Sequence, residues 1–218
     1  MRFDEYVSLG DNCETAFQLR RATGVDGGHF LDWTRVAPEV VATLIERRFA
    51  GILQPDALAF DPATALCVDR AYGHQFHHHF ADGARPQDDP RFEERLGNER
   101  RRADHLIPRL LQPRGPRCYV MRAQGRLNRI QAVRVRHAVA ALHPESDFLL
   151  VTVQAEAHRR PHPWRYPNIE ERFVSFVADP ASADVGDEPG WDAILTEFPL
   201  RPQRPANTSS AKVAMAAS

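Results

Sequence analysis

Cys13 is the residue whose type and position most directly indicate chemistry. It follows Gly10 by three residues and falls in the first turn of a helix predicted over residues 11–22. The N-terminus of a helix carries partial positive charge and unpaired N–H groups, which favour a thiolate over a thiol. The same N–H groups could hold the oxyanion that forms when a thiolate attacks a carbonyl. This position predicts a nucleophilic cysteine, with a buried structural cysteine as the alternative.

A cysteine nucleophile needs a base, and a cluster of four histidines between residues 74 and 79 offers one. If this segment is extended, His77 and His79 point to one side and His78 to the other. One of these imidazoles could then accept the proton of the Cys13 thiol. The plainer interpretation is a polar loop that contains histidines without chemistry.

Two further interpretations use neighbouring residues. His74 and a carboxylate, Asp69 or Asp82, could complete a metal site such as a zinc site around the histidine cluster. Alternatively, the turn at residues 10–12 could receive a phosphate at the start of the helix. Arg122 follows a predicted strand and could then meet an anionic or sugar-phosphate ligand in a non-catalytic module, although a surface arginine is the simpler interpretation.

Asp32 lies between apolar residues in the segment 30–33. A carboxylate in such surroundings is costly to bury unless it is paired. Asp32 could orient a catalytic histidine, or it could cap the helix that follows. Capping is the simpler of the two interpretations.

The elements that must position these residues alternate between strands and helices. Apolar runs predict strands over residues 6–10, 66–68, 118–121, 147–153 and 172–177. Helical spacing predicts helices over residues 11–22, 36–50, 90–112, 127–142 and 191–198, with the third kinked or ended early by Pro108. This alternation indicates an α/β domain with a central, largely parallel sheet flanked by helices. Ligands gather at the carboxyl ends of such strands, and residues 10–13 lie at one of them.

The composition is that of an ordinary folded protein. The chain has 218 residues, of which 43% are hydrophobic and 26% charged. We expect a single domain over residues 1–200 and a flexible tail over residues 201–218, which is rich in Pro, Ser and Ala. No apolar stretch is long enough for a membrane helix, and the acidic start does not resemble a signal peptide. Three widely spaced cysteines exclude a disulfide framework, so we expect a cytoplasmic protein.

The net charge of −1 hides a basic block over residues 91–136, which holds thirteen arginines and four acids. Such a block can contact nucleic acid. The aromatic residues that single-strand binders place between their basic residues are missing here. We therefore expect solvated helix faces and no nucleic-acid partner.

Taken together, these segments resemble a bacterial family of unknown function described as papain-like cysteine peptidases. The resemblance covers roughly residues 6–153. Its most specific part is Ser8-Leu9-Gly10-Asp11-Asn12-Cys13, followed by Phe30-Leu31-Asp32-Trp33, His78-His79-Phe80 and Tyr119-Val120-Met121-Arg122. Leu31 and His79 differ from the residues of the family's motifs. The resemblance implies a nucleophile at Cys13, a base best matched by His78, and Asp32 as a third member or a structural residue. It also implies a papain-like α+β fold, with the cysteine-bearing helix against a largely antiparallel sheet.

The sequence thus predicts a cysteine-dependent hydrolase or acyl transferase that acts on an acyl or amide carbonyl. The candidate substrate-binding residues are Asn12, Trp33, His79 and Arg122. We expect no cofactor and no membrane partner. The sequence leaves open the oligomeric state and whether the substrate is a small molecule or a peptide or glycan conjugate.

Overall fold

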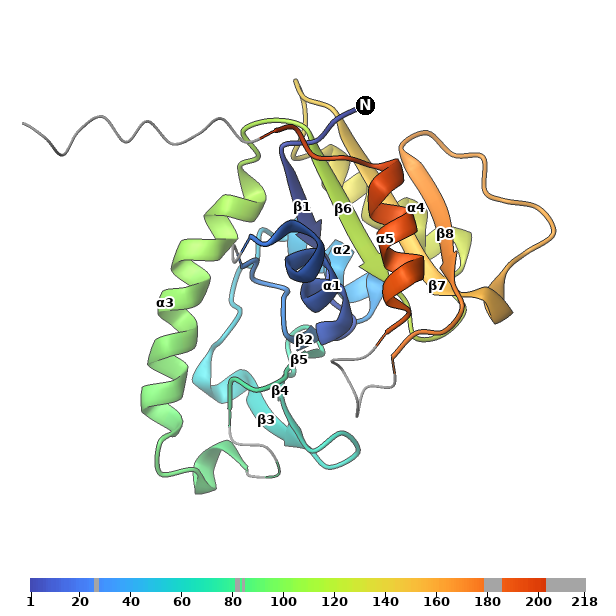
Figure 1. Ribbon diagram of the computed structural model, residues 1–218. Coiled ribbons are helices and arrows are strands. Elements are labelled where there is room, and N and C mark those ends of the chain that lie inside the picture. Colours follow the sequence, from blue (N-terminus) through green and yellow to red (C-terminus); the bar gives the residue numbers. More distant parts are fainter. Residues whose placement is uncertain (26–27, 81–82, 84, 179–185, 203–218) are drawn as a thin grey trace, which may run out of the picture.

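A four-stranded parallel sheet forms the centre of the computed structural model, which describes residues 1–25, 28–80, 83, 85–178 and 186–202 (Figure 1). In spatial order its strands are β1 (Glu5–Ser8), β6 (Arg117–Arg122), β7 (Phe148–Ala155) and β8 (Ile169–Val174). Each strand runs parallel to its neighbour. Every residue of β6 is buried, as expected for a strand covered by helices on both faces.

Helices pack on both faces of this sheet (Figure 1). One face carries α1 (Cys13–Thr23) and α5 (Glu188–Glu197), and the other carries α2 (Pro38–Glu46), α3 (Phe92–Leu111) and α4 (Arg129–Ala140). Successive residues of β6 alternate between the two cores. Cys118 and Val120 join the first core, and Tyr119 and Met121 join the second.

A second, antiparallel sheet is inserted between α1 and α3. Its spatial order is β2 (Thr34–Arg35), β5 (His74–Phe76), β4 (Leu66–Asp69) and β3 (Leu58–Asp61). Thr34 pairs with Phe76, so the short strand β2 fixes the end of β5. The described residues also form the 3-10 helices η1 (Pro55–Ala57), η2 (Pro86–Asp88) and η3 (Glu156–His158).

The predicted α/β class, with a parallel sheet flanked by helices, is confirmed. Most predicted elements are present. The corrections are the antiparallel sheet, of which only the strand at residues 66–68 was predicted, and several element boundaries. Helix α2 ends at Glu46 because Arg48 and Phe49 adopt left-handed backbone conformations. Helix α3 continues past Pro108 because Leu110 and Leu111 of its last turn are buried in the core. Within the described residues, no helix combines the length and the apolarity that crossing a bilayer requires.

Strand β8 begins at Ile169, three residues before the predicted start, because Ile169 pairs beside Leu150 of β7. The strand ends at Val174. The N–H of the next residue, Ser175, donates to the side chain of Asp187 instead of to the sheet. The predicted C-terminal tail lies outside the described residues from position 203 onward.

Candidate active site

The turn between β1 and α1 holds Cys13 at the first position of its helix. Gly10 has φ of 84°, and a side chain there would clash with Val36, so the turn requires glycine. Asn12 is the N-cap, and its Oδ1 accepts the N–H of Glu14 at 2.9 Å. Cys13 itself is only 1% exposed.

An imidazole lies directly against the thiol. The distance from Cys13 Sγ to His77 Nδ1 is 3.1 Å, although the two residues are 64 positions apart. His77 follows β5, and its backbone N–H donates to Trp33 O at 3.2 Å. The β2–β5 pairing and this bond hold His77 beside the helix N-terminus. The arrangement allows a proton to pass between the sulfur and the ring nitrogen.

His78 lies close to the same sulfur. Its φ is 68°, so the chain turns after Phe76 and does not continue as an extended strand. The rings of His77 and His78 therefore lie against each other on the same side, tilted by 43° and with centroids 3.7 Å apart, instead of alternating. One ligand atom from each of Cys13, His77 and His78 lies within 4.8 Å of the other two. His78 is the exposed member of the three.

His79 faces away from this group, toward α3. Its Nδ1 lies 3.2 Å from Glu99 Oε2. Burial, followed by the nearby charge of Arg102, lowers the pKa of His79 to about 3. The structure thus places this predicted substrate-binding residue in a partly buried polar contact between the second sheet and α3.

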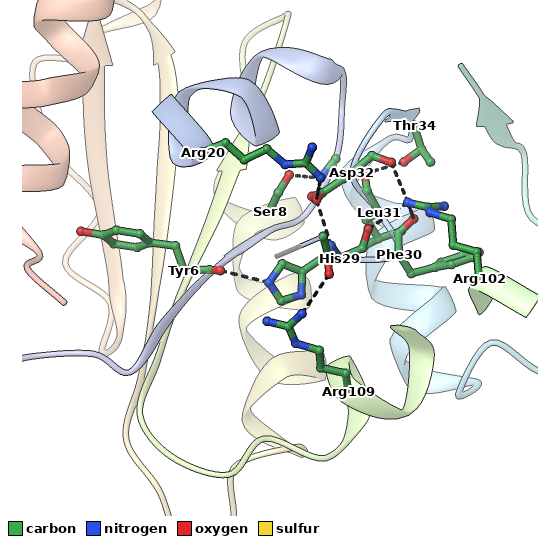
Figure 2. A network of polar contacts seen from close by, with 12 residues as sticks. Tyr6, Ser8, Arg20, His29, Phe30, Leu31, Asp32, Thr34, Arg102 and Arg109 are labelled. Atoms are coloured by element: carbon green, nitrogen blue, oxygen red, sulfur yellow. Dashed lines mark hydrogen bonds and ion pairs between the residues drawn. The ribbon is translucent and has the colours of Figure 1, made fainter. Parts of the chain in front are cut away.

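Asp32 binds the backbone of its own turn. It accepts the N–H of His29 at 2.8 Å, and Arg20 lies 3.5 Å from the same carboxylate oxygen (Figure 2). Burial raises the pKa of Asp32, and the His29 N–H opposes that shift. The N-cap of α2 is Ala37, so the predicted capping role does not apply. The contacts of Asp32 support a structural role in the segment that leads to Trp33.

Trp33 contributes through its backbone. Its carbonyl accepts the His77 N–H, and its φ is 61°. The indole ring lies 5.0 Å from the guanidinium carbon of Arg20, which is a cation–π distance. Trp33 therefore helps to position His77.

Arg122 lies beneath the helix that carries Cys13. It forms ion pairs with Asp11 at 2.9 Å and with Glu14 at 2.7 Å, and its side chain is fully buried. Glu14 also accepts the indole N–H of Trp191 and the backbone N–H of Ala178, both at 2.9 Å. Arg122 is therefore neither a surface arginine nor open to a substrate. It ties the carboxyl end of β6 to the start of α1.

The metal site considered around His74 is not assembled among the described residues. His74 is fully buried between the rings of Phe30 and Phe76, and burial lowers its pKa to about 3. Asp69 accepts the N–H groups of Leu53 and Ala71. Asp82 lies outside the described residues.

A cavity of about 650 Å³ lies between the C-terminal halves of α1 and α3. Its polar lining includes Glu5, His29, Asp32, Arg109 and Arg117. Glu5 pairs with both arginines, and the ring of His29 contacts the Tyr6 carbonyl (Figure 2). Cys13 and the histidine cluster are not among the lining residues, so the cavity is separate from the candidate active site.

The sequence singled out Cys13 and the histidine cluster as candidates, and the structure brings Cys13 together with His77 and His78. The sequence favoured His78 as the base, whereas the ring nitrogen 3.1 Å from the sulfur belongs to His77. Sequence reasoning also missed Glu14, whose place one residue after Cys13 carries no recognisable signal. No family model, curated protein or solved structure matches this chain.

Proposed function

We propose that this protein is a cysteine-dependent hydrolase or acyl transferase that attacks an acyl or amide carbonyl. The observation that carries the proposal is the 3.1 Å contact between Cys13 Sγ and His77 Nδ1 at the N-terminus of α1. A nucleophile within hydrogen-bonding distance of a base is the arrangement that thiol catalysis needs.

The reaction would proceed in two stages. His77 accepts the thiol proton, and the Cys13 thiolate adds to the carbonyl carbon of the substrate. The tetrahedral intermediate collapses to a thioester as the leaving group departs with the proton from His77. Water or another acceptor then attacks the thioester, gives its proton to His77, and releases the acyl product while the thiol is restored.

Asn12 supplies a donor for the oxyanion. Its Oδ1 accepts the Glu14 N–H, which leaves Nδ2 as a buried donor with no hydrogen-bond partner among the residues that the structure describes. A buried N–H that lacks a partner is costly, and such groups often serve a function. Together with the N–H groups at the start of α1, Asn12 Nδ2 would stabilise negative charge on the carbonyl oxygen.

Access to the sulfur requires local movement. Cys13 is nearly fully buried, whereas the adjacent His78 is exposed. A substrate would therefore reach the thiol by displacing the His78 ring. This assigns His77 as the base and His78 as the side chain at the entrance.

The papain-type assignment is part of this proposal. The cysteine-bearing helix packs on a parallel sheet here, and the histidine follows a strand of the antiparallel sheet. The support therefore comes from the pair of side chains and from the sequence resemblance, not from the sheet topology. The anion-binding alternative has less support, because the charge of Arg122 is met by two carboxylates.

The test is the formation of an acyl-enzyme. Full-length protein is mixed with p-nitrophenyl acetate, and intact-mass spectrometry follows the addition of one acetyl group. The proposal expects rapid acetylation at Cys13 that is lost in C13A and slowed at least tenfold in H77Q. H105Q, which changes an exposed histidine of α3, is the matched control. Equal acetylation of wild type and C13A would contradict the proposal.

A further inference from the structure

We propose that Cys13, His77 and His78 form a binding site for a soft divalent transition-metal ion of the zinc type. Thiolate sulfur and imidazole nitrogen are the ligands that zinc prefers in proteins. Among the described residues, these three side chains form a group whose ligand atoms all lie within 4.8 Å of one another. The distance from Cys13 Sγ to His77 Nδ1 is 3.1 Å, which two ligands of one tetrahedral ion can adopt with little adjustment.

The backbone explains why two consecutive histidines can serve one ion. Side chains of consecutive residues in a strand point to opposite faces, so an extended segment would separate them. The left-handed conformation of His78, with φ of 68°, brings its ring against that of His77. The conformation costs a non-glycine residue free energy, and it places both imidazoles beside the sulfur.

The burial of the three side chains suits a metal site in which one coordination position is left for solvent. Cys13 is buried, His77 is half-buried and His78 is exposed, so the group opens to solvent along one side. Three protein ligands leave the fourth tetrahedral position for water. On binding, the Cys13 thiol loses its proton to solvent and the thiolate takes its place as a ligand, while both histidines bind as neutral imidazoles.

Metal binding would block the thiol chemistry. The sulfur lone pair and the His77 nitrogen that the reaction needs would both be engaged by the ion. The site would thus act as a reversible inhibitory switch that responds to free metal concentration. This inhibitory consequence rests on the proposed function, whereas the binding itself does not.

The test is a titration of the untagged, chelator-treated full-length protein with Co²⁺. A thiolate–cobalt charge-transfer band and strong visible d–d bands should appear and saturate at one ion per chain, and Zn²⁺ should displace them. The charge-transfer band should be lost in C13S. H78A, which changes an exposed side chain, should weaken Co²⁺ affinity by roughly tenfold or more, while H105A should match wild type. Absence of the band in wild type, or its persistence in C13S, would overturn the proposal.

Alkylation of Cys13 in the metal-free protein separates the two proposals. Fast alkylation without a cobalt band would reject the metal site and leave the proposed function standing. A saturable cobalt band with alkylation no faster than at other cysteines would support the metal site and count against the proposed function.

Discussion

Glu14 and Arg122 form a fully buried ion pair directly beneath the helix that carries Cys13. Arg122 Nε lies 2.7 Å from Glu14 Oε2, and neither side chain is exposed. Burying two charges is favourable only when both are well paired, so the pair joins α1 firmly to the end of β6. This contact fixes the first turn of α1, which contains Cys13, against the end of β6.

We expect E14Q to lower the free energy of unfolding by about 3 kcal/mol, because it removes the fully buried carboxylate at Arg122 Nε and leaves the partly exposed Asp11 as the remaining carboxylate partner. Urea denaturation followed by circular dichroism measures the change. The matched control is E94Q, which breaks the exposed pair of Arg91 and Glu94 and should change the free energy of unfolding far less than E14Q does. Similar losses in both variants would show that the buried pair has no special role.

Gly10 should be intolerant of a side chain. G10A combines a left-handed φ of 84° with a clash against Val36. G51A meets the same backbone conformation, with φ of 76°, but has open space around the new methyl group. We expect G51A to cost about 1 kcal/mol of stability and G10A clearly more. Equal melting temperatures for the two variants would contradict the packing described for this turn.

The two roles of Asn12, as the N-cap of α1 and as the proposed oxyanion donor, can be tested separately. N12S keeps a side-chain acceptor for the Glu14 N–H but removes the donor that Nδ2 provides. We expect acetylation of Cys13 by p-nitrophenyl acetate to fall by about 10²-fold in N12S, since an oxyanion donor is lost. Alkylation by iodoacetamide forms no oxyanion and should stay close to the wild-type rate. A parallel fall in both rates would mean that Asn12 only shapes the helix start.

The fold should lose stability in mild acid through His29. Burial, partly offset by Glu5, lowers the pKa of His29 to about 4 from an ordinary value of 6.5. The unfolded chain binds a proton at this ring below pH 6.5, while the folded chain resists it until about pH 4. The contribution of His29 to the free energy of unfolding is therefore fully present above pH 6.5 and is lost as the pH drops. Near pH 5 the loss from this one group is about 2 kcal/mol.

Urea titrations of wild type and H29Q across this pH range measure the effect. The pH dependence should be shallower in H29Q than in wild type, whereas H105Q should keep the wild-type slope. An unchanged slope in H29Q would show that His29 is not held neutral in the fold.

The sequence allowed the central sheet to be predicted because its strands are apolar runs separated by helices with clear spacing. The antiparallel sheet was largely missed, since β2 has two residues and β5 has three, too few to show a period. Its absence from the prediction mattered, because this sheet supplies the histidines.

Which histidine lies against Cys13 depends on one backbone angle. The sequence pointed to Cys13 through the glycine turn and the helix start, which are local signals. Whether His77 or His78 meets the sulfur is decided by the left-handed turn at His78, and histidine carries no strong preference for it. The ion-pair partners of Arg122 could not be predicted from the sequence either, because Glu14 and Asp11 lie more than a hundred positions away.

The reactivity of the three cysteines tests the central claim most directly. Cys13, Cys67 and Cys118 are all buried to at least 98%, so burial alone would make them equally slow. Burial raises the pKa of the Cys67 thiol to about 12 and that of Cys118 further still. Only the imidazole and the helix N-terminus at Cys13 should set it apart.

The measurement is the rate of iodoacetamide labelling of each cysteine in native, metal-free protein, read by peptide mass spectrometry. The account predicts that Cys13 labels at least tenfold faster than Cys67 and Cys118, and that H77Q removes most of this advantage. If Cys13 labels no faster than the other two thiols, the contact between Cys13 and His77 does not activate the sulfur and the proposed chemistry is wrong.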